Sequence, residues 1–213
     1  MQRVKDLLKS AERNRWLFYG DSITHGAKHT NGSRDFSELF RERVIWELQR
    51  KEDLVLNSAF SGFSTTNLSA DFEWRAAAFR PNAAFVMIGC NDSKIMDAET
   101  FGKQLNELLD KFEAINTLCI LMTPLPVLRN LDTSRAAVPE FAGVVRRIAA
   151  ERNLPLIDNF ESWSKHPAAF YLHADILHPN EYGHRKIAQD IFRALDIFDE
   201  KSIVCRLFAP DAL

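Results

Sequence analysis

Serine, histidine and carboxylate side chains occur in this sequence where buried strands are expected to end. Ser22 follows the apolar and aromatic run Trp16–Tyr19 and a Gly-Asp pair, and His178 lies three residues after Asp175. A serine hydroxyl is a weak nucleophile unless an adjacent base removes its proton. A neutral imidazole oriented by a carboxylate is such a base. These residue types therefore predict acyl transfer with Ser22 as the nucleophile.

Two further predicted strand ends carry residues suited to the same chemistry. One is Ser61-Gly62 and the other is Gly89-Cys90-Asn91-Asp92. Each motif alone is more common as an ordinary turn. In a parallel sheet, however, the carboxyl ends of the strands meet along one edge, where ligands bind. We therefore expect these segments to converge with Ser22 and His178.

The elements that must position these residues alternate between strand and helix. Short apolar runs predict five strands, at 16–19, 54–56, 83–88, 118–122 and 154–157. Apolar residues at helical spacing predict helices, at about 4–13, 36–50, 67–79, 101–112, 141–148 and 181–195. This alternation favours parallel strands with right-handed crossovers and helices on both faces. We expect a three-layer α/β/α fold around a doubly wound, mostly parallel five-stranded sheet.

The whole chain, residues 1–213, is expected to form a single domain, because it contains no internal repeat, linker or low-complexity segment. The segment 199–213 forms a C-terminal tail. Its apolar residues around Ile203 and Val204 are compatible with a strand or with an arm that packs on a neighbouring subunit. A homo-oligomer formed through this tail is therefore one expectation.

Amino-acid composition argues against several classes of protein, among them nucleic-acid-binding, membrane-inserted and disulfide-rich proteins. Hydrophobic residues make up 46% and charged residues 26% of the chain, and the net charge is -2. With no long basic run, a nucleic-acid partner is not expected. No apolar run is long enough for membrane insertion, and the N-terminus lacks the apolar region of a signal peptide. Three widely spaced cysteines favour a reducing, cytoplasmic location over a disulfide framework.

Taken in chain order, these segments resemble the signature blocks of the SGNH, or GDSL-type, hydrolase family. The matching residues are Gly20-Asp21-Ser22-Ile23-Thr24, Gly62, Gly89-Cys90-Asn91-Asp92 and Asp175-Ile176-Leu177-His178-Pro179. The resemblance implies a flavodoxin-like fold and a catalytic triad of Ser22, Asp175 and His178. It also implies an oxyanion hole formed by the backbone N–H groups of Ser22 and Gly62 and the side-chain amide of Asn91. No cofactor is implied, because acyl transfer needs only these groups.

A metal site is the rival interpretation of the histidines. His173, His178 and His184 cluster in sequence with Asp175. A metalloenzyme would be expected to show a second tight pair, such as two histidines four residues apart on a helix. Because no such pair is present here, we predict no metal. His184 is expected to be a solvated or capping residue, and Asp158 is the alternative acid partner for His178.

The predicted function is a serine esterase that hydrolyses carboxylic esters of a small molecule through an acyl-enzyme on Ser22. Short loops and the lack of an apolar lid favour a short acyl group such as acetyl. The alternatives are a lysophospholipase or thioesterase acting on longer chains, and a non-catalytic module that binds carbohydrate or another small molecule. Three aromatic residues either line the acyl pocket or complete the core: Trp163, Phe170 and Tyr171.

Overall fold

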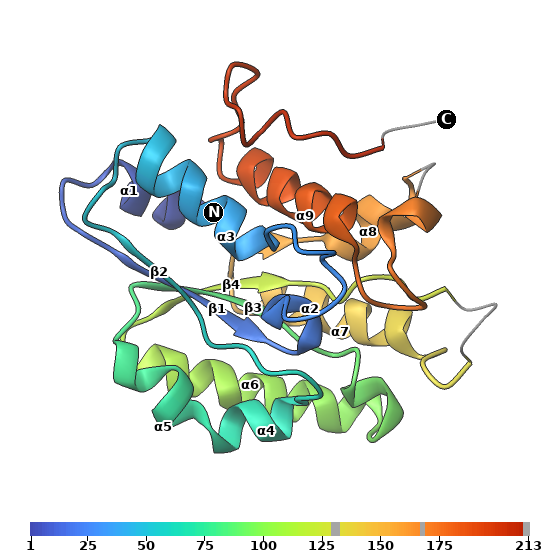
Figure 1. Ribbon diagram of the computed structural model, residues 1–213. Helices are drawn as coiled ribbons and strands as arrows, with labels where there is room; N and C mark the ends of the chain where they lie inside the picture. Colours follow the sequence, from blue (N-terminus) through green and yellow to red (C-terminus); the bar gives the residue numbers. More distant parts are fainter. Residues whose placement is uncertain (129–132, 167–168, 211–213) are drawn as a thin grey trace.

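The computed structural model describes residues 1–128, 133–166 and 169–210. Within them, one parallel sheet of five strands runs in the order β2-β1-β3-β4-β5 (Figure 1). The strands are β1 (Arg15–Gly20), β2 (Leu54–Asn57), β3 (Ala83–Met87), β4 (Leu118–Met122) and β5 (Leu156–Ile157). The first strand, β1, lies inside the sheet, with β2 on one side of it and β3, β4 and β5 in turn on the other. The crevice of such a sheet opens at the carboxyl ends of β1 and β3.

Helices cover both faces of the sheet, so the three-layer prediction is confirmed (Figure 1). One face packs against α1 (Gln2–Lys9), α3 (Phe36–Arg41), α8 (Asn159–Ser164) and α9 (Glu181–Ala194). The other packs against α4 (Thr65–Ala70), α5 (Phe72–Arg75), α6 (Ala98–Ala114) and α7 (Val138–Glu151). Trp16 and Phe18 of β1 point to the first face, and Leu17 and Tyr19 point to the second. Burial of each such side chain contributes roughly 1.5–3 kcal/mol.

The end of β1 is built for close packing and a tight turn. A Cβ atom on Gly20 would lie 2.3 Å from the carbonyl oxygen of Met87, so only glycine lets β1 and β3 approach there. Asp21 then caps the four-residue helix α2 (Ser22–His25), because its Oδ1 accepts a hydrogen bond from the backbone N–H of Ile23 at 2.9 Å. Ser22 is thereby fixed at the first position of α2.

Two predicted helices are irregular. The expected helix 67–79 is divided into α4, α5 and the 3-10 turn η2 (Ala77–Phe79), which stops at Arg80 in the left-handed region. The expected helix 36–50 becomes α3 followed by the π-helix η1 (Glu42–Glu47). In η1 the Arg43 side chain is buried and donates hydrogen bonds to the carbonyl of Ile197 and to Glu47. The remaining short turns are 3-10 helices, η3 (Asp92–Lys94) and η4 (Ala169–Leu172).

The tail after α9 forms no strand within its described residues, so that part of the prediction is wrong. The tail instead packs on its own chain, with Val204 and Cys205 buried. Its backbone groups find side-chain partners: Val204 N–H donates to Glu47, and Gln189 donates to the carbonyl of Cys205 at 3.2 Å. A role as an oligomer arm stays a prediction.

Two further features concern the cysteines and the character of the helices. All three cysteines are buried and unpaired. Among the described residues, no helix combines the length and the apolar character needed to cross a membrane.

Candidate active site

Ser22 and His178 meet at the carboxyl edge of the sheet. The Ser22 Oγ lies 2.9 Å from Nε2 of His178, within hydrogen-bond distance. Ser22 is presented by α2 directly after β1, whereas His178 comes from the segment that leads into α9. The pair thus has the separation that a nucleophile and its base require.

Asp175 holds the other side of the His178 ring. Its Oδ2 accepts from Nδ1 of His178 at 2.8 Å, and its Oδ1 accepts from the backbone N–H groups of Leu177 and His178 at 2.9 and 2.7 Å. Burial acts to raise the pKa of Asp175, but these hydrogen bonds outweigh it and lower the pKa to about 2. Because an ionised carboxylate fixes the proton on Nδ1, Nε2 is left to accept the proton of Ser22.

The turn that carries this pair is held by local bonds. Ala174 N–H donates to the carbonyl of His178 at 2.8 Å. The predicted cap of the last helix is also present, since the Asn180 side chain accepts from the N–H groups of Tyr182 and Gly183. Asp175 and His178 are therefore ordered mainly by contacts within a few residues of sequence.

Gly62 and Asn91 line the same cleft as Ser22 and His178. The cleft holds about 320 Å³ and is lined by Ser22, Lys28, His29, Ser61, Gly62, Asn91, Arg135, Leu177 and His178. Phe60 N–H donates to the carbonyl of Gly20, and Asn91 Nδ2 donates to the carbonyl of Phe63 at 2.9 Å. These two bonds hold the Gly62 segment between the ends of β1 and β3. An amide carries two N–H hydrogens, so one remains for a ligand.

The φ of +86° at Gly62 is one that a side chain would disfavour. No heavy atom lies within 4 Å of the position that a Cβ would take there. Glycine is therefore required by the backbone conformation and not by crowding. The open space leaves the backbone of this segment accessible from the cleft.

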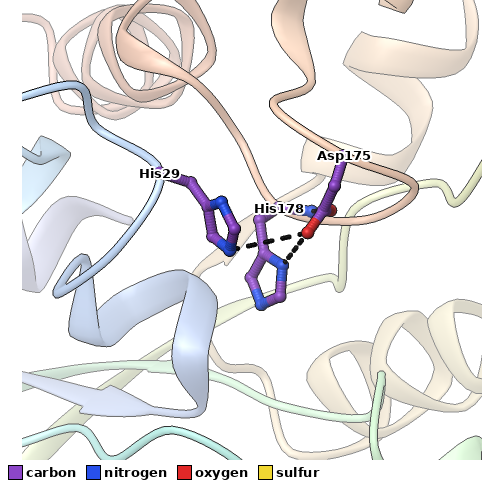
Figure 2. Close-up of side chains that lie close together, drawn as sticks. All are labelled: His29, Asp175 and His178. Atoms are coloured by element: carbon purple, nitrogen blue, oxygen red, sulfur yellow. Dashed lines mark hydrogen bonds and ion pairs between the residues drawn. The ribbon is translucent and has the colours of Figure 1, made fainter.

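His29 is a residue of the site that the sequence interpretation missed. Figure 2 shows its ring beside His178, with Nε2 directed at the carboxylate of Asp175. The two imidazole rings stack with centroids 4.5 Å apart and planes 21° apart, and His29 Nε2 lies 3.5 Å from Asp175 Oδ2. His29 belongs to the irregular segment between α2 and α3, where no periodicity signals a contact with residues so distant in sequence.

Of the three histidines considered for the rival metal site, His178 contacts Asp175, whereas His173 and His184 have other partners. The His173 nitrogens lie 3.0 and 3.1 Å from the carbonyl oxygens of Ala169 and Pro126. His184 is buried, so the solvated alternative is wrong, and its Nδ1 accepts from the N–H of Phe36 in the first turn of α3, as a capping side chain does. Burial lowers the pKa of His184 to about 3, which keeps the ring neutral.

The ligand-type atoms that do cluster are those of His29, Asp175 and His178, all within 4.8 Å of one another. The two rings are nearly parallel, however, so their in-plane lone pairs do not converge on one point. A tetrahedral zinc ion needs ligands that converge. This arrangement favours ring stacking and hydrogen bonding, and the lack of a metal stays a prediction.

Asp158 is occupied away from His178. Its carboxylate accepts two hydrogen bonds from Arg146, at 2.6 and 2.9 Å, and one from Thr123. It also caps α8 by accepting from the N–H of Glu161. The carboxylate within reach of His178 is therefore that of Asp175.

The other polar residues beside the signature positions have structural contacts. Asp92 Oδ1 accepts from both the N–H and the hydroxyl of Thr65, which fixes the start of α4. Burial raises the pKa of Asp21 to about 7 and the pKa of the Cys90 thiol to about 12. A thiol with so high a pKa holds no reactive thiolate at neutral pH.

The aromatic residues considered for the pocket divide into two groups. Trp163 is fully buried in the core cluster on the α9 side of the sheet, so it does not line the cleft. Phe170 and Tyr171 lie in η4, but their side chains fall outside the described part of the chain.

Comparisons with known proteins agree on one family. A sequence model of the GDSL-like Lipase/Acylhydrolase family matches residues 18–186. An acetylxylan esterase of Geobacillus stearothermophilus is 28% identical over 213 residues, which cover 88% of this chain and 96% of that protein.

Solved structures show the same fold. An α/β hydrolase from the metagenome of Lake Arreo, Spain, superposes with a TM-score of 0.75 at 23% identity, over 91% of this chain and all of the other. An acetyl xylan esterase superposes with a TM-score of 0.74 at 20% identity, over 84% of this chain and 98% of the other. At such identities, the likeness establishes the architecture alone.

Proposed function

Because the chain belongs to the GDSL-like lipase/acylhydrolase family and is an ester hydrolase, we propose that Ser22 is its nucleophile. His178 takes the proton of Ser22 as the hydroxyl attacks the ester carbonyl, and Asp175 stabilises the imidazolium that forms. His178 then gives that proton to the leaving alcohol, and an acyl-enzyme remains on Ser22. The observation that carries this proposal is the chain of contacts from Ser22 Oγ to His178 at 2.9 Å and on to Asp175 at 2.8 Å.

Water completes the cycle by the same route. His178 removes a proton from the attacking water and returns it to Ser22 as the acyl group leaves. In both halves the carbonyl oxygen becomes an oxyanion that needs donors arranged in advance. We assign these donors to the backbone N–H groups of Ser22 and Gly62 and to the free N–H of Asn91. Their shared cleft supports this assignment.

The substrate that fits best is an acetyl ester on a carbohydrate. The cleft is small, at about 320 Å³, and Leu177 is the one large aliphatic residue among the described residues that line it. A long acyl chain would need an extended apolar surface to leave water. The likeness to an acetylxylan esterase over 96% of that protein's length supports the same choice.

Covalent labelling and a chain-length series test the proposal. A serine-directed phosphonate should modify Ser22, as located by peptide mass spectrometry, and Ser22→Ala should abolish both labelling and hydrolysis of aryl acetate. Among aryl esters from acetate to octanoate, acetate should have the highest kcat/KM. An active Ser22→Ala protein would refute the nucleophile, and faster turnover of octanoate would refute the acetyl preference. Binding of acetylated oligosaccharide without turnover would favour a non-catalytic module.

A further inference from the structure

His29 contacts two members of the proposed triad, yet the proposed mechanism gives it no role. Its ring covers one face of the His178 ring, with the centroids 4.5 Å apart (Figure 2). The side chains of His29 and His178 are only 20% and 22% exposed. A ring held between a stacked neighbour and its carboxylate has little freedom to tilt. His29 is therefore placed to fix the plane in which His178 Nε2 faces Ser22.

The carboxylate of Asp175 links the two histidines. Its Oδ1 is occupied by two backbone N–H groups, so its Oδ2 is the atom that faces side chains. His178 Nδ1 reaches that oxygen at 2.8 Å and His29 Nε2 at 3.5 Å. The second distance exceeds that of an ordinary hydrogen bond, so the contact is mainly electrostatic. A proton on His29 Nε2 draws some of the negative charge of Oδ2 away from His178.

The charge of His29 is set by the groups around it. Those that face it are His178, Asp175 and Lys28. Burial lowers the pKa of His29, and the neighbouring His178 lowers it further, while Asp175 opposes both. These effects together favour the neutral form of the His29 ring. A neutral ring can stay stacked on His178 when the base becomes an imidazolium, whereas a charged ring would repel it.

We propose that His29 is a positioning residue for the base: its neutral ring fixes the plane of His178, and its Nε2–H moderates the charge of Asp175. This inference rests on the proposed function, because it assumes that His178 is the base. His29 touches no reacting atom in this scheme. Its effect is expected mainly in kcat and in the pH profile, with a smaller effect on KM because the ring also lines the cleft.

Two substitutions at His29 distinguish the contribution of its ring from that of its N–H group. His29→Ala removes both, and kcat for aryl acetate should fall about tenfold, because a modest misplacement of a catalytic group has a cost of at least this size. His29→Phe keeps a flat ring and should retain most of kcat. His29 also lines the cleft, so KM is expected to rise in His29→Ala by a smaller factor than the fall in kcat, and to change least in His29→Phe. A rise in KM with kcat unchanged, or equal kcat values for wild type and His29→Ala, would overturn the proposal.

The pH profile gives the sign of the effect. Removing His29 exposes His178 to water and leaves more negative charge on Asp175 Oδ2, and both changes favour the imidazolium. The acid-side midpoint of kcat/KM should therefore move to higher pH in His29→Ala. In His29→Phe the shift should be smaller, because the ring still excludes water. A midpoint that does not move in His29→Ala would contradict the proposal.

An independent measurement separates this proposal from the proposed function. In Ser22→Ala protein, which is expected to be inactive, the ¹⁵N resonances of His178 can be titrated with and without His29→Ala. The His178 midpoint should again rise when His29 is removed, whether or not the wild type hydrolyses esters. Absence of that rise would overturn the role of His29, whereas failure of wild-type hydrolysis would overturn only the proposed function.

A variant of the same loop serves as the control. Asn31 lies two residues after His29, and its side chain donates to Glu181 at 2.8 Å. Its φ of +52° is one that glycine adopts easily, so Asn31→Gly removes this anchor without adding strain. If Asn31→Gly leaves kcat and the midpoint unchanged, the effects of His29→Ala belong to the imidazole. If it reproduces them, loop order alone is responsible and the proposal fails.

Discussion

The two ends of the sheet each carry a hollow, and the larger hollow is not at the proposed active site. At the carboxyl ends of the strands, the cleft of about 320 Å³ contains Ser22, Asn91 and His178. At the amino ends of β4 and β5, a hollow of about 620 Å³ is lined by residues of α6, of the segments that follow α6 and α7, and of the N-terminus. There Arg152 is paired with Asp110 at 2.7 Å and with Glu113 at 2.8 Å. The volume of a hollow therefore does not indicate chemistry, whereas its polar groups do.

The difference arises because the two ends of a parallel strand join different kinds of segment. The amino-end hollow lies where α6 and α7 stop, at Asn116 and Asn153, which both adopt positive φ. These two residues reverse the direction of the chain after each helix. The carboxyl ends instead lead into loops and helix starts, where Ser22 and Asn91 are free to face a ligand. Substitutions at the two ends should thus have very different consequences.

The largest effect is expected when the carboxylate that orients the base is neutralised. Asp175→Asn should lower kcat by about 10⁴-fold, the loss seen when the corresponding change is made in a Ser-His-Asp triad. Steady-state kinetics on aryl acetate measures it. Asp158→Asn is the matched control, because Asp158 pairs with Arg146 instead, and its kcat should change little. The opposite ranking of these two variants would assign the acid to Asp158.

A smaller loss is expected from the proposed oxyanion donor. Asn91→Ala should lower kcat roughly 10²–10³-fold, because one prearranged donor to the oxyanion is removed. The matched control at the other end of the sheet is Asn116→Gly, which lines the amino-end hollow and keeps its positive φ. Equal loss of kcat in both variants would show that the two ends of the sheet do not differ in their contribution to catalysis.

The pH dependence of stability should also differ between residues of the carboxyl edge. Burial raises the pKa of Asp21 from 3.8 to about 7, so the folded protein holds this proton more tightly than the unfolded chain. The stability associated with the protonated carboxyl is complete below pH 3.8 and is lost as the pH rises through about 7. Asp21→Asn cannot ionise, and its oxygen can still accept from Ile23. Its free energy of unfolding relative to wild type should therefore increase between pH 4 and 7.

Urea unfolding at several pH values measures this difference. Asp158→Asn provides the comparison, because burial acts to raise the pKa of Asp158 but its hydrogen bonds, first among them those from Arg146, hold that pKa below 3.8. The stability that Asp158 contributes is lost only as the pH falls below about 4, so this variant should run parallel to wild type between pH 5 and 7. Parallel curves for Asp21→Asn as well would show that its carboxyl is ionised in the folded protein.

The smallest effect is expected at the amino-end hollow. Arg152→Ala removes two ion pairs whose acidic partners are 66% and 78% exposed. Such pairs contribute up to about 1 kcal/mol each, so the urea midpoint should fall slightly while kcat is unchanged. A large loss of activity in Arg152→Ala would mean that this hollow takes part in function after all.

The sequence is sufficient to predict the sheet because strand and helix patterns there are strong. The run Trp16–Tyr19 is buried on both faces, as expected for an interior parallel strand, and Ser22 follows β1 at the carboxyl edge as expected. Asp175 and His178 are also expected where a strand ends, but among the described residues they follow no strand and lie in the irregular segment between η4 and α9. Local pattern plus a topological rule therefore places Ser22, whereas the position of His178 beside it depends on how that segment packs.

Other features depend on contacts that no local pattern contains. His29 lies in a loop, and its stacking on His178 arises only when two distant segments pack together. The helix expected over 67–79 has the right apolar spacing, but its backbone departs from helical geometry at Asp71 and again at Ala76. The tail resembles a strand in sequence because Ile203 and Val204 are β-formers, whereas side chains from α9 and η1 satisfy its backbone.

The short turn that carries Asp175 and His178 is a local unit, because the acid and the base are three residues apart and hydrogen-bonded to each other. One hydrogen bond, between residues 156 positions apart in sequence, joins this turn to the nucleophile. Mild heating should separate Ser22 from His178 before it breaks the bonds within the turn, because those bonds are local and this contact is not. Activity would then be lost at a temperature several degrees below the unfolding transition measured by circular dichroism, and it would return on cooling.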